Sequence, residues 1–328
     1  KSIVMKPFKF VPYLKTTIWG GEQIAPFKGI STELQHIGES WEISGVAGFE
    51  SLTADRGLTD DADLGKHLPQ LIEEYKGELV GNRIYEQYGS TFPLLIKLID
   101  SSQNLSVQVH PDDKLAKERH GCHGKTEMWY VMKTEPGSKI FTGLSKQITP
   151  DDYEQLATAP VENGHSPMED VLASYESHPG DLFFLPAGRL HAIGAGNFLA
   201  EIQQTSDITY RVYDYGRLDV NGKPRELHIE QAKDAIDYRV YSDYRSAYDA
   251  ASSNAELVSC PYFRVNRIIA EDAMDIDLHT DAFVVVMCLD GDAIVNDVHV
   301  RQGETILVPA CDNILHISGQ ATFLTATM

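Results

Sequence analysis

Short runs of aliphatic, β-branched and aromatic residues recur along the chain, and each is bounded by Gly, Pro, Asp or Asn. The clearest runs are PLLIKLI (93–99), LSVQVH (105–110), MWYVM (128–132), DLFFLP (181–186), FVVVMCL (283–289) and TILVPA (305–310). Runs of this length and composition are typical of strands, and many of them separated by turn residues indicate a sandwich or a barrel. The pattern therefore predicts a mostly-β protein.

Helical periodicity is confined to a few segments. The segment 63–81 carries apolar residues at helical spacing, namely Leu64, Leu68, Leu71, Ile72 and Tyr75. Thr149, followed by a proline and two aspartates, predicts the capped start of a second helix, and 225–238 predicts a third. The stretch 241–256 is rich in Ser and Ala and poor in aliphatic residues, so it predicts a linker or a helix with little core-facing surface.

The chain contains an internal repeat. Residues 180–191 read GDLFFLPAGRLH and residues 303–314 read GETILVPACDNI, so both have Gly, five residues and then Pro-Ala. A repeated strand–turn–strand unit in two β-rich halves indicates two related β-domains. We therefore predict a first domain over 1–240, a linker over 241–256 and a second domain over 257–328.

The chain has 328 residues and a formal net charge of −20 at pH 7. This charge argues against nucleic acid and anionic membranes as partners, because both require a basic face. The sequence contains no run of about 18 apolar residues, so no membrane-spanning helix is expected, and its first residues do not predict a signal peptide. Four cysteines without a Cys-x-x-Cys pair predict a reducing, cytoplasmic location.

The first repeat unit resembles the second sequence motif of the cupin superfamily. The motif positions are occupied by Gly180, Pro186, Gly188 and His191. The resemblance implies two cupin-type jelly-roll barrels with a few helices inserted, and it implies that the motif histidine binds a metal. In the second unit Cys311 replaces Gly188 and Ile314 replaces His191. We therefore expect a second, degenerate barrel that is metal-free, with Ile314 filling its interior.

Four side chains form a candidate metal site. Gln108 and His110 lie two residues apart on a strand-like run, and the period of two points both to one face. Glu127 opens the next predicted strand, and His191 follows a Pro-Ala-Gly turn. Imidazole and carboxylate ligands suit zinc, so we expect one zinc ion per chain. A competing cluster of cysteine and histidine side chains consists of His120, Cys122 and His123.

Several segments, in order, resemble the type I mannose-6-phosphate isomerases in their short bacterial form. They are QVHPDD, KTEMWYV, LPAGRLHA and SDITYR, with TTIWGG, GESWEIS and PLLIKLID also similar. The resemblance runs from about residue 10 to about residue 230. It implies that the zinc ligands are Gln108, His110, Glu127 and His191, and that the catalytic residues include Arg211, Lys125, Lys97 and Asp207. In one departure, Gly124 stands where many members carry a histidine.

The resemblance also implies an aldose–ketose isomerase acting on mannose 6-phosphate and fructose 6-phosphate through an enediol(ate). Such a reaction needs a base at carbon, for which Lys125 and Glu201 are alternatives. A phosphate dianion needs compensating cations, for which the candidates are Arg211, Arg217 and Lys97. Trp19 and Glu201 are also assigned to the substrate pocket, although Trp19 could instead pack at the barrel mouth.

Two other functions are open. Two histidines and a glutamate are also the ligand set of non-haem iron oxygenases. A cupin that binds a sugar phosphate without turning it over would keep the same basic residues. The lysines, Arg211 and an amide as fourth ligand favour the isomerase over the oxygenase.

Overall fold

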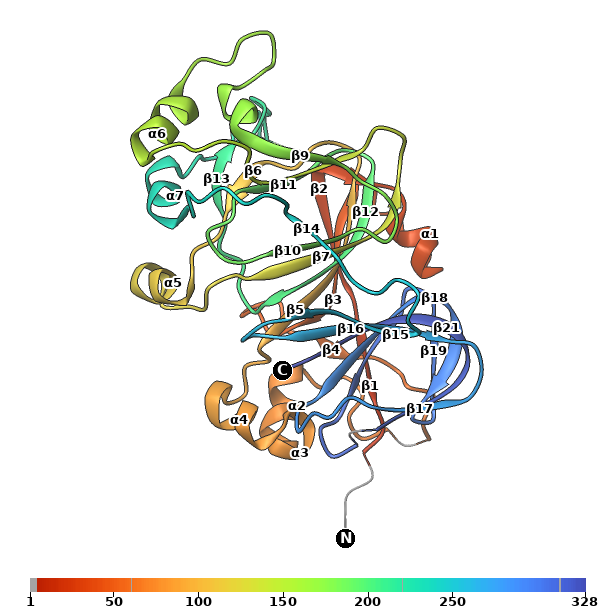
Figure 1. Ribbon diagram of the computed structural model, residues 1–328. Helices are drawn as coiled ribbons and strands as arrows, with labels where there is room; N and C mark the ends of the chain where they lie inside the picture. The colour runs from red at the N-terminus through yellow and green to blue at the C-terminus, as the bar shows by residue number, and fades with distance from the viewer. Residues whose placement is uncertain (1–4, 60, 220, 313) are drawn as a thin grey trace.

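The computed structural model describes residues 5–59, 61–219, 221–312 and 314–328. Residues 1–4, with which the predicted first domain begins, lie outside this description. The strands form three antiparallel sheets, here called sheets I, II and III. Sheet I lies between the other two (Figure 1). The mostly-β prediction is confirmed.

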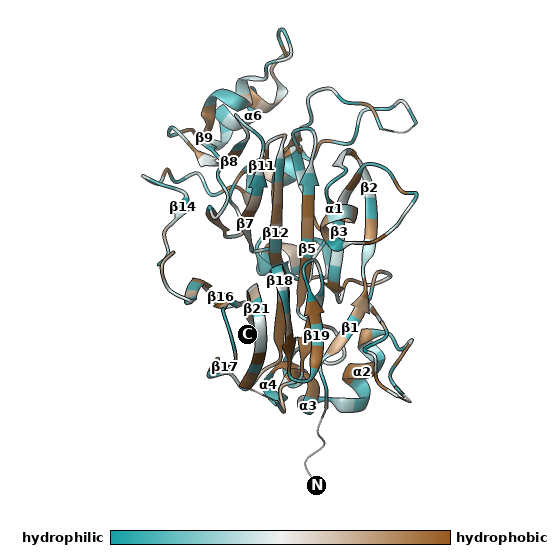
Figure 2. Cartoon of the chain, turned by 90° about the vertical axis from the view of Figure 1, so that its right-hand side faces the viewer, coloured by the Kyte–Doolittle hydropathy of each residue, from teal (hydrophilic) through white to brown (hydrophobic). Residues whose placement is uncertain are grey.

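Sheet I has the strand order β14-β10-β7-β12-β5-β2-β3. Its strands are β2 (Tyr13–Gly21), β3 (Ile37–Ser44), β5 (Leu94–Ser101), β7 (Glu127–Thr134), β10 (Leu182–Leu185), β12 (Asn197–Gln204) and β14 (Arg245–Ser246). Every residue of β5 and β12 is buried, because both faces of the sheet are covered. Figure 2 shows the hydrophobic stretches of these two strands in the middle of the molecule.

Sheet II has the order β13-β6-β11-β8-β9. Its strands are β6 (Val107–Val109), β8 (Lys139–Leu144), β9 (Leu172–Glu176), β11 (His191–Ile193) and β13 (Tyr210–Tyr213). A shared core joins it to sheet I, in which Trp129 and Leu199 of sheet I pack with Ile140 and Ile193 of sheet II. Two antiparallel sheets facing each other in this way agree with the barrel expected from the cupin-type motif.

Sheet III has the path β15-β16-β21-β18-β20-β1-β4, with β17 paired to β21 and β19 to β18. Its strands are β1 (Phe8–Val11), β4 (Leu52–Thr53), β15 (Asn254–Ser259), β16 (Arg264–Ala270), β17 (Met274–Asp277), β18 (Val284–Val295), β19 (Val298–Arg301), β20 (Thr305–Val308) and β21 (Ile314–Thr327). Phe8 of β1 pairs with Leu307 of β20, so the sheet combines strands from both ends of the chain. The predicted boundary near residue 240 is therefore crossed by backbone hydrogen bonds, and the division into two domains stays a prediction.

Strand alternation places β5 between two cores. Leu94, Ile96 and Leu98 belong to the core that also contains Val285 and Leu324 of sheet III. The residues between them point to the opposite face, toward sheet II. The face of sheet I that meets sheet II is called the inner face below.

The helices lie at the margins of the sheets. They are α1 (Ile24–Lys28), α2 (Leu68–Tyr75), α3 (Gly77–Val80), α4 (Asn82–Tyr88), α5 (Asp113–His120), α6 (Pro150–Thr158) and α7 (Ile229–Ala235), with a 3₁₀ turn at Pro167–Val171. Thr149 caps α6 as predicted, because its hydroxyl accepts the N–H of Asp152 at 3.1 Å. Among the described helices, none combines the length and the apolar composition needed to cross a membrane.

The helical pattern over 63–81 does not form one helix. Lys76 has φ of 50° and Gly81 has φ of 97°, and backbone in this left-handed region ends an α-helix. The segment is therefore divided between α2 and α3, and α4 begins directly after it. Leu64, expected on the core face, precedes α2 and is 53% exposed. Likewise, only Ile229–Ala235 of the predicted third helix is helical.

The stretch 241–256 is not helical; apart from two short strand segments it consists of irregular chain and turns. Residues Arg245–Ser246 form β14, and Asn254 begins β15. Tyr244 is buried, and its hydroxyl donates to the carbonyl of Leu144 at 2.9 Å. This tyrosine attaches the segment to the end of β8 in sheet II, although the residues around it carry few aliphatic side chains.

Both repeat units form a strand, a turn and a second strand, namely β10–β11 and β20–β21. The expectation that Ile314 fills the second interior is wrong, because its side chain is exposed. Leu315, one residue later, is fully buried in a core with Val286 and Phe323. Alternation along β21 turns the two neighbours to opposite faces. Asn313, which precedes Ile314 in the repeat, lies outside the described residues.

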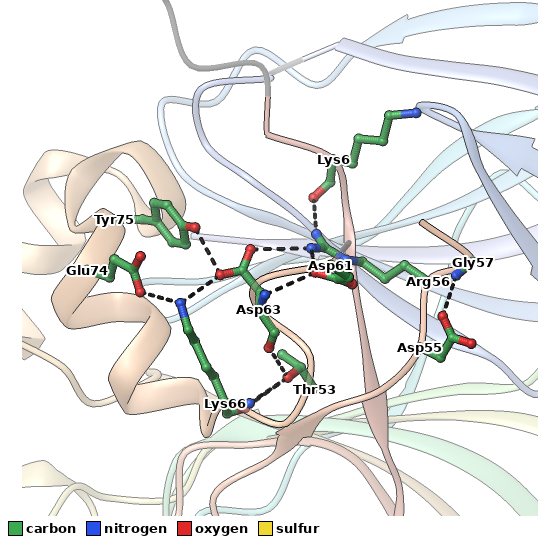
Figure 3. Close-up of polar contacts among 10 residues, drawn as sticks. All are labelled: Lys6, Thr53, Asp55, Arg56, Gly57, Asp61, Asp63, Lys66, Glu74 and Tyr75. Carbon is green, nitrogen blue, oxygen red and sulfur yellow. Dashed lines mark hydrogen bonds and ion pairs between the residues drawn. The ribbon is translucent and has the colours of Figure 1, made fainter. Parts of the chain in front are cut away.

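A buried ion cluster fixes the segment between β4 and α2 (Figure 3). Arg56 donates from Nε to the carboxylate of Asp61 at 2.8 Å, and its guanidinium lies 3.3 Å from Asp63. Arg56 also donates to the carbonyl of Lys6, while the Tyr75 hydroxyl donates to Asp63 at 2.9 Å. The side chain of Arg56 is only 6% exposed. The cluster thus connects the chain before β1, the loop and α2.

Replacing Arg56 by Met should lower the free energy of unfolding by about 3 kcal/mol, since removing one partner leaves buried carboxylates without compensation. Urea unfolding followed by tryptophan fluorescence measures the change. The matched control is Arg239→Met, which breaks an arginine–aspartate pair whose guanidinium is 77% exposed and should leave the midpoint unchanged. Equal midpoints for the two variants would contradict a stabilising role of the cluster.

Candidate metal centre

Charged side chains interrupt the otherwise apolar inner face of sheet I. They are Glu39 on β3, Lys97 on β5, Glu127 at the start of β7 and Glu201 on β12, and all four are buried. Burying a charge is costly unless it is paired. Such a concentration of buried charge between two sheets indicates a site rather than a packing core.

Glu127 meets two buried histidines where sheets I and II approach each other. The Nε2 atom of His110 lies 3.5 Å from one Glu127 oxygen, and Nε2 of His191 lies 3.2 Å from the other. All three residues are at most 1% exposed, and their candidate ligand atoms lie within 4.8 Å of one another. In the described ranges this is the one group of at least three His, Cys, Asp or Glu side chains close enough to hold a metal ion.

Hydrogen bonds fix how both imidazoles face the carboxylate. The Nδ1 atom of His110 lies 2.9 Å from the carbonyl oxygen of Ile208, and Nδ1 of His191 lies 2.8 Å from that of Arg189. A carbonyl only accepts, so each Nδ1 carries the proton and each Nε2 presents a lone pair. Nε2 of His110 and both oxygens of Glu127 are buried without a hydrogen-bond partner. Unsatisfied buried acceptors of this kind fit a bound cation.

The pKa shifts of His110 and Glu127 also fit a bound metal ion. Burial, together with the ammonium of Lys125, lowers the pKa of His110 to about 3, which keeps the imidazole neutral. Burial opposes ionisation of Glu127, but Lys125 and the two histidines outweigh it and hold the pKa of Glu127 well below its ordinary value. Neutral imidazoles and an ionised carboxylate are the forms that bind a divalent metal.

Gln108 and Arg211 lie in one row with His191. Across sheet II, Arg211 pairs with Gln108 and Gln108 pairs with His191. The amide nitrogen of Gln108 is 3.4 Å from Nε2 of His191, so the predicted amide ligand lies beside the histidine. Arg211 donates to the carbonyl of Glu226 at 2.9 Å, and its Nε is buried without a partner.

A cavity of about 780 Å³ opens in front of this group. The residues that line it include Lys15, Trp19, Glu39, Lys97, Gln108, Lys125, Glu201, Asp207, Arg211 and Arg225. Lys125, which lies 3.4 Å from Glu127, and Gln108 connect the cavity to the three buried residues. The structure thus brings together all predicted site residues except Arg217, while their roles stay predictions.

Arg225 occupies the cavity wall to which the sequence had assigned Arg217. Both guanidinium groups bind Asp214, and Arg217 also donates to the carbonyl of Asn104. Arg225 lines the cavity, whereas Arg217 does not belong to its walls. No sequence pattern indicates that Arg225 is a site residue, because only tertiary contacts bring its loop to the cavity. Glu39 could have been noticed, since GESW puts an acid and a tryptophan on one strand face.

Gly124 explains the departure from the family pattern. A Cβ atom at this position would lie 2.5 Å from the backbone nitrogen of Asp113. The chain therefore passes too close to the start of α5 for a histidine here. His123 lines a different cavity and packs on Tyr88 with ring centres 5.3 Å apart.

The competing cluster at residues 120–123 is not assembled as a metal site. His120 shares a hydrogen bond of 2.8 Å with the hydroxyl of Tyr210. In the C-terminal part of the chain, three histidines each lie beside an aspartate on the surface, namely His279, His299 and His316. These three histidine side chains are exposed and do not form a buried ligand set.

A family model for the catalytic domain of type I phosphomannose isomerases matches residues 8–140. Mannose-6-phosphate isomerase ManA of Bacillus subtilis is 34% identical over 269 residues, which cover 80% of this chain and 79% of the relative. A mannose-6-phosphate isomerase of Streptococcus mutans is 32% identical over 298 residues, covering 89% of each chain.

The backbone agrees over the whole length. The crystal structure of a mannose 6-phosphate isomerase from Bacillus subtilis matches with a TM-score of 0.85 and 30% identity, covering 99% of this chain and 100% of that one. Sequence identity above 30% over four fifths of both chains, joined to this agreement in fold, identifies the chain as a member of the type I phosphomannose isomerase family.

Proposed function

We propose that the protein is a zinc-dependent isomerase that interconverts mannose 6-phosphate and fructose 6-phosphate. The observation that carries the proposal is the buried His110–Glu127–His191 group directly behind a cavity lined by Lys125 and Arg211. The substrate phosphate and the enediolate are both anionic, so cations are needed in a chain with a net charge of −20. The family membership supports the same activity.

His110, Glu127 and His191 would hold the ion, with Gln108 as a fourth ligand. Two imidazoles, a carboxylate and an amide suit zinc better than the hard cations, which prefer oxygen ligands alone. When bound, zinc would supply Lewis acidity toward the substrate oxygens and a template for their placement.

Proton transfer between C1 and C2 falls to groups on the cavity wall. Burial, with the nearby carboxylate of Glu127, raises the pKa of Glu201 above its ordinary value, which brings it nearer to the range useful for acid–base catalysis. Lys125 is the alternative base, and Asp207 lies on the same wall. Proton transfer by a histidine at position 124 is excluded, because the close packing at Gly124 leaves no room for that side chain.

Arg211 would stabilise the oxyanion that develops in the enediolate. Its guanidinium is held by the carbonyl of Glu226 and keeps an unpartnered Nε–H. Donors fixed before the reaction stabilise developing charge without reorganisation. For the phosphate group we propose Arg225 beside Arg211, with Trp19 as an apolar wall. Arg217 would then act indirectly, through the Asp214 carboxylate that it shares with Arg225.

Two measurements test the function. Purified protein should convert mannose 6-phosphate to fructose 6-phosphate, and elemental analysis should find about one zinc per chain, since the described residues contain one buried ligand group. Binding of mannose 6-phosphate without turnover by a zinc-loaded protein would favour the non-catalytic cupin. Iron in place of zinc, with no isomerase activity, would favour the oxygenase.

We also propose that the barrel from residue 257 onward is metal-free, as a degenerate repeat. Its interior packs Leu315, Val286 and Phe323, which offer no ligand atoms. The described cysteines are all free thiols, which supports the cytoplasmic location predicted from their spacing.

A further inference from the structure

A row of four paired residues crosses sheet I at the level of the cavity. Trp41 pairs with Lys97, Lys97 with Glu201, and Glu201 with Trp129. Residues paired directly across antiparallel strands point to the same face. All four side chains therefore lie on the inner face, and Glu39, two residues before Trp41 on β3, joins them there.

The ammonium of Lys97 lies between two buried carboxylates. Its Nζ is 3.2 Å from Oε1 of Glu201 and 3.4 Å from Oε2 of Glu39. Lys97 is 4% exposed and Glu201 is 3% exposed. Two ionised carboxylates close together repel each other, and a cation between them removes that repulsion. The position of Lys97 is thus determined from two sides.

Each of these carboxylates is in turn held by an indole. Nε1 of Trp41 donates to Glu39 at 2.6 Å, and Nε1 of Trp129 donates to Glu201 at 2.7 Å. Lys97 Nζ also lies 5.1 Å from the ring centre of Trp41, within the range of a cation–π interaction. Both tryptophans are 1% exposed, so neither can turn away.

Glu39 and Lys97 both stay charged over the pH range in which enzymes work. Burial opposes ionisation of Glu39, but Lys97, Lys15 and the Trp41 N–H outweigh it and lower its pKa to about 2. Burial also opposes the charge on Lys97, yet neighbouring carboxylates raise its pKa above the ordinary value. The carboxylates that act on it are Glu39, Glu201, Asp207 and Glu127. A lysine held in this way cannot take up a proton from substrate.

We propose that Glu39 and Trp41 are positioning residues that hold Lys97 as a fixed ammonium on the cavity wall, where it binds the anionic substrate and its enediolate. Lys97 touches the substrate in this scheme, whereas Glu39 and Trp41 act only through Lys97. The inference rests on the proposed isomerase function. It assigns Lys97 to binding of negative charge and explains why a buried acid and a tryptophan share one face of β3.

A double-mutant cycle tests the proposal. Glu39→Gln keeps an acceptor for the Trp41 N–H but removes the charge, and it should lower kcat by roughly 10- to 100-fold, the scale of a misplaced catalytic group, with metal content unchanged. In a Lys97→Met background the same substitution should change kcat by less than about twofold, because the ammonium that Glu39 positions is already absent.

Trp41→Phe provides a second variant that keeps the core intact if Lys97→Met fails to fold. It retains the ring over Lys97 and deletes one hydrogen bond, so kcat should fall in the same direction by a smaller factor. Tyr13→Phe is the matched control. Tyr13 packs on Trp41 with ring centres 5.6 Å apart but lies outside the cavity wall, and its hydroxyl should be dispensable.

Two results would overturn the proposal. A kcat loss from Glu39→Gln as large in the Lys97→Met background as in the wild type would show that Glu39 acts by itself. Wild-type kcat and KM in Trp41→Phe would show that the indole positions nothing. If the wild type is not an isomerase at all, urea unfolding of the same cycle still decides the pairing: coupling between Glu39 and Lys97 supports it, and additivity contradicts it.

Discussion

His191→Ala should lose nearly all bound metal and lower kcat by more than about 10³-fold, beyond the usual cost of removing one preorganised donor. The reason is geometric. His191 supplies one of two imidazole Nε2 atoms beside Glu127, and its Nδ1 is already committed to the carbonyl of Arg189. Alanine removes the ligand, and no other described side chain of this cluster can replace it.

The fold should survive this change, because the apolar cores of the sheets do not depend on His191. Elemental analysis, isomerase assay and circular dichroism on one preparation separate metal loss from unfolding. His299→Ala is the matched control, since this exposed histidine lies beside Asp292 on sheet III and should retain metal and activity. A folded His191→Ala protein with about one metal per chain would contradict the assigned centre and would also place a metal elsewhere, for example in the second barrel.

Arg211→Ala should lower kcat by about 10²- to 10³-fold while metal content stays at the wild-type level. Arg211 reaches the cavity from β13, in the row that leads through Gln108 to His191, but it is not itself a ligand. If its guanidinium stabilises charge that grows in the enediolate, its contribution is larger in the transition state than in the ground state. The effect then appears in kcat.

Arg211→Lys refines this test, because lysine keeps the charge and loses the planar fork of donors. We expect a smaller but still substantial loss of kcat. Arg239→Ala replaces an exposed arginine and should leave both kcat and KM unchanged. A raised KM with wild-type kcat in both Arg211 variants would refute the catalytic role and assign Arg211 to binding of the phosphate.

Much of the local structure could be predicted because it depends on neighbours in the chain. The apolar runs that became β5, β10, β18 and β20 are continuous because nearly all of their side chains are buried on both faces, and a run of adjacent apolar residues is a local property. Thr149 caps α6 through a contact three residues away. The buried residues His110, Glu127 and His191 were recognised because each adjoins a strand or turn with a pattern of its own.

Other predictions failed where one residue of register or one backbone angle decides the outcome. The pattern over 63–81 cannot reveal that Lys76 and Gly81 adopt positive φ, since apolar spacing continues through both. Ile314 was expected inside because the repeat aligns it with His191, yet the alternation of β21 turns it outward and buries Leu315.

The sequence by itself determined the fold class, the repeat and the residue types able to bind a metal. Tertiary structure alone decided which distant charges meet. Lys97 is one of many lysines until strand pairing brings Glu201 beside it, about a hundred positions away, and Glu39 lies on a third strand. Arg225 replaces Arg217 at the cavity because of loop packing. Strand propensity is a short-range property, whereas the electrostatics of a buried site depend on distances between segments that only the folded chain brings together.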